Sequence, residues 1–175
     1  ELQSAACAND VARLDEVLRS TNAASVNARV GPREETALHA ACRSADGNVA
    51  CCELLLAAGA DPSVLCVHGG TCLHQAAQFV NDGALVAMLQ HCPAATLAAV
   101  ANVQDKNGWT ALHAAVYKPS RSGPTPHSRT RIVQELLRAQ ADIGIRNAAG
   151  QTALELAVAS ECHDGAQAIA QLCSR

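Results

Sequence analysis

The heptapeptide TALHAAC at residues 36–42 has three similar counterparts further along the chain, and this recurrence decides the fold. The other copies are TCLHQAA at 71–77, TALHAAV at 110–116 and TALELAV at 152–158. The threonines that begin the four segments are 35, 39 and 42 residues apart. A second segment also recurs, since ELLLAAGAD at 53–61 matches ELLRAQAD at 135–142. Self-similarity at a period of this length predicts a repeat protein, in which each unit buries its apolar face against its neighbours.

These motifs resemble the ankyrin-repeat family, whose signature tetrapeptide is T-P-L-H, and DKNGWTALHAA at 105–115 is the best match within the chain. Alanine or cysteine replaces the proline in every copy. The resemblance spans nearly the whole chain and implies an all-α fold. This fold is an ankyrin-repeat solenoid of stacked helix-turn-helix units with projecting β-hairpin loops. We expect one domain at 1–175, with repeats at approximately 1–30, 31–65, 66–104, 105–146 and 147–175.

Each part of the motif has an expected role. The threonine is placed to cap the first helix of its unit, because its hydroxyl can accept from a free backbone N–H group. The resemblance implies that His39, His74 and His113 hydrogen-bond to a neighbouring hairpin, and that Glu155 alters this bond in the last unit. Gly59 is the expected left-handed helix terminator, and Gln140 takes its place later. The predicted helix pairs are 2–8 with 11–19, 36–44 with 49–58, 71–80 with 83–91, 110–117 with 131–139, and 152–160 with 165–173.

The composition also favours stacked thin layers over a thick core. Aromatic residues make up only 2% of the chain, and its hydrophobic residues are mainly alanine, leucine, valine and cysteine. A net charge of −3 gives no reason to expect attraction to nucleic acid or to a membrane surface. The nine cysteines include no C-x-x-C pair, so we expect reduced thiols in a protein of the cytoplasm or nucleus.

Two insertions interrupt the repeat. The longer, KPSRSGPTPHSRTR at 118–131, is basic, and its three prolines and one glycine predict a loop without helix. It is either a mobile connection or a contact segment for an acidic partner. The shorter, HCPAATL at 91–97, is expected to form a turn.

No motif indicates catalysis, since a glycine-rich phosphate loop, H-E-x-x-H and G-x-S-x-G are all absent from the sequence. Cys66, His68, Cys72 and His74 are the one cluster of metal-binding residue types. Its spacing is not that of a zinc finger, and His74 already has a role in the repeat. We therefore expect no metal, no cofactor and no enzymatic activity. A metal-binding module is the third alternative.

Partner binding is the expected function, because all three large aromatic side chains map to positions that the family uses for contacts. Trp109 ends a hairpin, while Tyr117 and Phe79 end first helices. The alternative is that these rings only pack on neighbouring hairpins and stabilise the stack. The wider predicted contact set is Lys106, Asn107, Lys118, His68, Gln78 and Arg43. Most charges of the first hairpin, at 29–35, are expected to be solvated.

The sequence therefore predicts a monomeric, non-catalytic module that binds another protein or a peptide on its concave face. The chain starts at Glu1 and not at Met, which favours an excised domain. This start motivates a second hypothesis, a regulatory ankyrin domain of a larger enzyme or channel.

Overall fold

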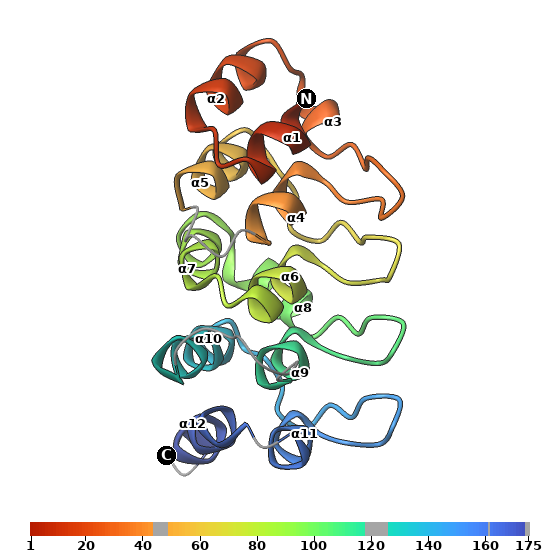
Figure 1. Cartoon of the computed structure of the whole chain (residues 1–175), viewed down its shortest axis with the longest axis vertical. Coiled ribbons are helices and arrows are strands. Elements are labelled where there is room, and N and C mark those ends of the chain that lie inside the picture. The colour runs from red at the N-terminus through yellow and green to blue at the C-terminus, as the bar shows by residue number, and fades with distance from the viewer. Residues whose placement is uncertain (44–48, 118–125, 161, 174–175) are drawn as a thin grey trace.

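The computed structural model describes residues 1–43, 49–117, 126–160 and 162–173. These residues form five helix pairs that stack in chain order, with a loop projecting to one side between successive pairs (Figure 1). The inner helices are α1 (Leu2–Cys7), α4 (Ala37–Cys42), α6 (Cys72–Phe79), α9 (Ala111–Val116) and α11 (Ala153–Ala159). The outer helices are α2 (Val11–Arg19), α5 (Val49–Ala57), α7 (Asp82–His91), α10 (Pro126–Arg138) and α12 (His163–Cys173). We number the units one to five by their inner helices.

Like helices pack on like helices along the whole stack. Each inner helix contacts the inner helix of the next unit, and each outer helix contacts the next outer helix. Within every unit the two helices also contact each other. The copies of the sequence motif are therefore parallel copies in space, which confirms the predicted all-α ankyrin-repeat solenoid.

Small apolar side chains fill the space between the layers. The motif leucines Leu38, Leu73 and Leu112 are buried, and so are the alanines at positions 40, 41, 76, 77, 114 and 115. Alanine adds little bulk between helices, so neighbouring units approach closely. The three large aromatic residues take no part in the fully buried core, in agreement with the composition.

The motif threonine and the residue three positions later close the start of the inner helices α4, α6, α9 and α11. The Thr36 hydroxyl accepts from the backbone N–H of His39 at 3.4 Å, and the Thr36 N–H donates to Nδ1 of the His39 ring at 3.3 Å. Nδ1 is thus an acceptor, so the ring proton lies on Nε2, which donates to the Gly70 carbonyl of the next hairpin at 3.3 Å. The equivalent Nε2 bonds run from His74 to the Trp109 carbonyl at 2.9 Å and from His113 to the Gln151 carbonyl at 3.0 Å.

Burial lowers the pKa of His39, His74 and His113, which keeps the rings neutral in this arrangement. In the fifth unit a Glu155 carboxylate oxygen accepts instead from the Thr152 N–H at 2.8 Å and from Arg146 Nη1 at 2.9 Å. The backbone bond from Thr152 is the main reason why the pKa of Glu155 is lowered. The sequence prediction of a changed bond in the last unit is confirmed.

Left-handed residues end two outer helices at the predicted places. Gly59 follows α5 with φ of 88°, and Gln140 follows α10 with φ of 63°. A residue with a side chain is strained at a positive φ, so Gln140 stabilises the fold less than glycine would at this position. In the third unit Val80 has φ of 57° and ends α6, a conformation that β-branched residues rarely adopt.

Three helical segments were not predicted. The short helices α3 (Ala23–Val26) and α8 (Ala94–Ala101) follow outer helices of the first and third units. The predicted turn at 91–97 is therefore wrong, because Pro93 caps a helix that continues past it. The helix-free reading of 118–131 is also wrong in part, since α10 begins at Pro126. Proline is tolerated in the first turn of a helix, where its missing N–H would have no partner.

Two further features concern membrane-spanning helices and cysteine thiols. Within the described residues, no helix is long and apolar enough to cross a membrane. The eight cysteines with described side chains are free thiols; Cys7 is exposed and Cys92 is half-buried, while the others are buried. Burial raises the pKa of the Cys92 thiol to about 11, which makes it a poor nucleophile at neutral pH.

Candidate partner-binding surface

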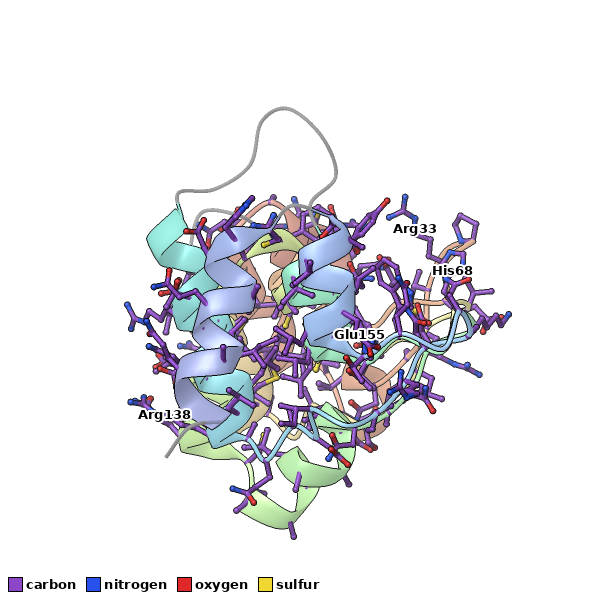
Figure 2. The ribbon with its side chains drawn as sticks, turned by 90° about the horizontal axis from the view of Figure 1, so that it is seen from below. Arg33, His68, Arg138 and Glu155 are labelled. Carbon is purple, nitrogen blue, oxygen red and sulfur yellow. The ribbon has the colours of Figure 1, made fainter. Side chains whose placement is uncertain are left out.

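The projecting loops form a continuous rim because each hairpin is bonded to the next. The Val67 N–H donates to the Arg33 carbonyl at 2.9 Å, and the Lys106 N–H donates to the His68 carbonyl at 2.9 Å. The Ala148 N–H donates to the Asn107 carbonyl at 3.0 Å. Figure 2, which looks along the stack, shows Arg33 and His68 at this rim and Arg138 on the opposite side of the molecule.

The close approach of the last two hairpins requires a glycine. Gly108 has φ of 72°, and a Cβ atom there would lie 2.6 Å from the Ala148 nitrogen. No side chain fits at that distance, and the left-handed conformation also favours glycine. Gly108 therefore lets the fourth hairpin lie against the fifth.

In the fourth unit, Trp109 and Tyr117 form an aromatic pair. Their ring centroids are 4.8 Å apart with planes at 64°, an edge-to-face arrangement. The Trp109 backbone is fixed on both sides, because its N–H donates to Asp105 Oδ1 at 2.9 Å and its carbonyl accepts from His74. Trp109 is half-buried against the core, whereas Tyr117 is 41% exposed. The pair thus combines the Trp109 ring, which is packed against the core, with the accessible Tyr117 ring.

Phe79 ends the inner helix of the third unit and is 37% exposed, next to the exposed Gln78. Within the described residues it makes no ring contact with Trp109 or Tyr117. The structure therefore brings two of the three predicted anchors together and leaves the third on a neighbouring unit.

The hairpin tip beside Trp109 has a fixed backbone and exposed side chains. Asp105 Oδ1 accepts from the Asn107 N–H at 2.8 Å as well as from Trp109. Lys106 and Asn107 are exposed at this tip, and His68 is exposed at the preceding one. Of the predicted contact residues, Lys118 lies outside the described part of the chain.

In the second unit, an ion pair occupies the positions that the aromatic pair occupies in the fourth. Glu35 precedes the motif threonine and Arg43 lies seven residues after it, as do Trp109 and Tyr117 in their unit. Arg43 Nη1 donates to Glu35 Oε2 at 3.1 Å, and Arg33 Nη1 lies 4.0 Å from Glu35 Oε1. Glu35 is only 3% exposed. Glu35 is therefore the exception in a hairpin whose charges were mostly predicted to be solvated.

We call the surface made of the hairpin tips and the C-terminal ends of the inner helices the hairpin face. The contacts within two units, Glu35 with Arg43 and Trp109 with Tyr117, show that the hairpin and the helix end come together there. Both pairs are eight residues apart in the sequence. This spacing could have indicated that Glu35 contacts Arg43.

The metal-like cluster has other partners. The Cys72 thiol donates to the Pro62 carbonyl at 3.5 Å, and His74 is engaged by Thr71 and Trp109. Among the described residues, no three or more side chains of histidine, cysteine, aspartate or glutamate are grouped in a way that could hold a metal ion.

Comparison with known proteins agrees with this geometry. No curated protein matches the sequence. A family model described as "Ankyrin repeats (3 copies)" matches residues 2–96, 46–123 and 73–174. Ankyrin repeats are in general protein–protein interaction modules. The matches cover nearly the whole chain, and the chain belongs to the ankyrin-repeat family.

Proposed function

We propose that this chain is a non-catalytic module that binds a partner protein or peptide on its hairpin face. Trp109 and Tyr117 are the anchors in this proposal. The other contact residues are Phe79, Lys106, Asn107, Lys118, His68, Gln78 and Arg43. The observation that carries the proposal is the edge-to-face pair of Trp109 and Tyr117, which presents an accessible tyrosine beside a braced tryptophan.

Aromatic anchors contribute most when they are held in place before binding. Tryptophan and tyrosine are enriched among the residues that dominate binding energy. Both backbone polar groups of Trp109 are hydrogen-bonded, and its ring packs on the core and on Tyr117. Little side-chain freedom is left to lose when a partner binds, which supports affinity.

The proposal is tested with peptides selected on the folded protein from a phage-displayed random library. Selected peptides are titrated against the wild-type protein and against the Trp109→Ala/Tyr117→Ala double variant. Loss of two anchors should weaken binding by about a hundredfold, at roughly 1.4 kcal/mol for each tenfold change. Circular dichroism should show unchanged helix content.

Val11→Ala is the matched control, because Val11 is also an exposed apolar residue but lies on the outer helix α2. It should bind the selected peptides like wild type. If the double variant and the wild-type protein bind them equally well, the anchors are wrongly assigned.

A further inference from the structure

A hollow of about 840 Å³ lies on the hairpin face of the first two units, away from the aromatic pair. The inner helix α1 lines one side with Gln3 and Ser4, and the hairpin lines the other with Val30, Arg33 and Glu35. Arg43, at the end of α4, lines the hollow as well. The volume falls within the range of about 300–1,000 Å³ typical of ligand clefts.

Positive charge exceeds negative charge in this hollow. The buried Glu35 carboxylate is the only acidic group among its described lining residues, and it faces two guanidinium groups, those of Arg33 and Arg43. The neighbouring Arg29 and Glu34 pair with each other at 3.1 Å and add no net charge. The local excess of one positive charge is opposite in sign to the net charge of the chain, −3.

The hydrogen-bonding capacity is also unbalanced. Two guanidinium groups carry about ten N–H donors, whereas one carboxylate offers about four acceptor sites. The Arg33 side chain is 59% exposed, and its Nη1 lies as far as 4.0 Å from Glu35 Oε1. Its ion pair with Glu35 is therefore loose. Arg43 is held more firmly, because its 3.1 Å bond ends on a carboxylate that cannot turn away to solvent. A second carboxylate would offer about four further acceptor sites to the donors that Glu35 does not engage, and its charge would balance the local excess.

We propose that this hollow binds an acidic side chain of a partner peptide, with an Asp or Glu carboxylate held between Arg33 and Arg43. The inference rests on the proposed peptide-binding function and names the chemistry of one part of the partner. Glu35 acts as a positioning residue, because its carboxylate orients the Arg43 guanidinium and keeps both arginine side chains directed into the hollow. Gln3 and Ser4 supply further polar groups, and Val30 supplies apolar contact for the stem of the bound side chain.

The probe is the synthetic peptide acetyl-Ala-Glu-Ala-Glu-Ala-amide, with its glutamine counterpart as the matched control. Each is titrated into the protein while the arginine Nε–Hε resonances are followed by NMR. The glutamate peptide should shift the Arg33 and Arg43 signals in a saturable way and leave the signal of Arg19, on the outer helix α2, unmoved. The glutamine peptide should bind about tenfold more weakly, because charge-assisted hydrogen bonds are lost.

Arg33→Gln removes the looser guanidinium without leaving Glu35 unpaired and should weaken the glutamate peptide by about tenfold. Arg19→Gln removes the same charge from an exposed ion pair elsewhere and should have no effect. Equal affinity for both peptides, no shift at Arg33 and Arg43, or full affinity in Arg33→Gln would each overturn the inference.

The Trp109→Ala/Tyr117→Ala variant separates this inference from the proposed function. It should bind the glutamate peptide like wild type, since the hollow lies on other units. A failure of the anchors with an intact acidic site would reject the aromatic anchors alone, and the reverse result would reject the acidic site alone.

Discussion

The second and fourth units place different side chains at the same two positions of the repeat. In the second, Glu35 and Arg43 form an ion pair whose carboxylate is buried. In the fourth, Trp109 and Tyr117 form an aromatic pair whose tyrosine is accessible. The backbone arrangement that brings the two positions together is common to both units. The comparison teaches that this scaffold holds a hairpin residue against a helix end and leaves the chemistry of the pair free to vary.

The two pairs should differ most in their contribution to stability. Arg43→Ala leaves the Glu35 carboxylate buried with only the distant Arg33, and we expect a loss of about 2–3 kcal/mol in the free energy of unfolding. Urea denaturation measures the change. The double variant Glu35→Gln/Arg43→Gln should recover most of the loss, because no buried charge remains. A stability of Arg43→Ala equal to wild type would show that Glu35 does not need its partner.

Acidification should weaken the histidine bonds to the hairpins that precede α6 and α9. His39 donates to Gly70 in the hairpin that follows the second unit, and His74 donates to Trp109 itself. The pKa of each histidine is below its usual 6.5 in the folded state, so the unfolded chain binds more protons as the pH falls below that value. The free energy of unfolding should therefore decrease between about pH 7 and pH 5.

Urea midpoints at the two pH values, followed by Trp109 fluorescence, test this expectation. His113→Gln should reduce the pH dependence, because a lowered histidine pKa is removed. Greater stability at the lower pH would contradict the assignment of neutral, buried rings.

The aromatic pair should contribute less to folding than the ion pair. Tyr117→Ala removes one edge-to-face contact and a partly exposed ring, and we expect a loss of about 1 kcal/mol. Tyr117→Phe keeps the ring and should match wild type in stability. Urea denaturation of the two variants measures the difference. A loss as large as that of Arg43→Ala would mean that the aromatic pair is mainly a structural element.

The smallest effects are expected at exposed charges of the hairpin face. Arg33→Gln and Lys106→Gln should change the free energy of unfolding by less than about 0.5 kcal/mol, since exposed charges contribute little to folding. Thermal unfolding monitored by circular dichroism measures both. A large loss in Arg33→Gln would show that its long contact with Glu35 is structural.

The fold was predictable because its signals are local. Thr36 and His39 are three residues apart, and the bonds that they form at a helix start depend on that spacing alone. The left-handed positions of Gly59 and Gln140 follow from where a helix must end. The start of α10 was missed because the three prolines of 118–131 were all taken to exclude helix. One of them, Pro126, occupies the first turn of α10, where proline is tolerated.

The site was less predictable because burial there depends on contacts between units. Glu35 lies in a hairpin rich in charged residues, which the sequence predicts to be solvated. Its burial depends on the folded stack, in which α1 and Arg43 lie beside it. Trp109 and Tyr117 were predicted by their positions, but their mutual contact depends on how the hairpin lies against the helix end. The hollow beside Glu35 has no sequence motif of its own.

The most direct test of partner binding on the hairpin face uses the fluorescence of Trp109, the only tryptophan in the chain. Library-selected peptides carrying a fluorescent label would be titrated while label anisotropy and tryptophan emission are recorded together. We predict that both signals saturate at the same peptide concentration, because the partner covers the Trp109–Tyr117 pair. Binding seen by anisotropy with no change in Trp109 emission would contradict the assignment.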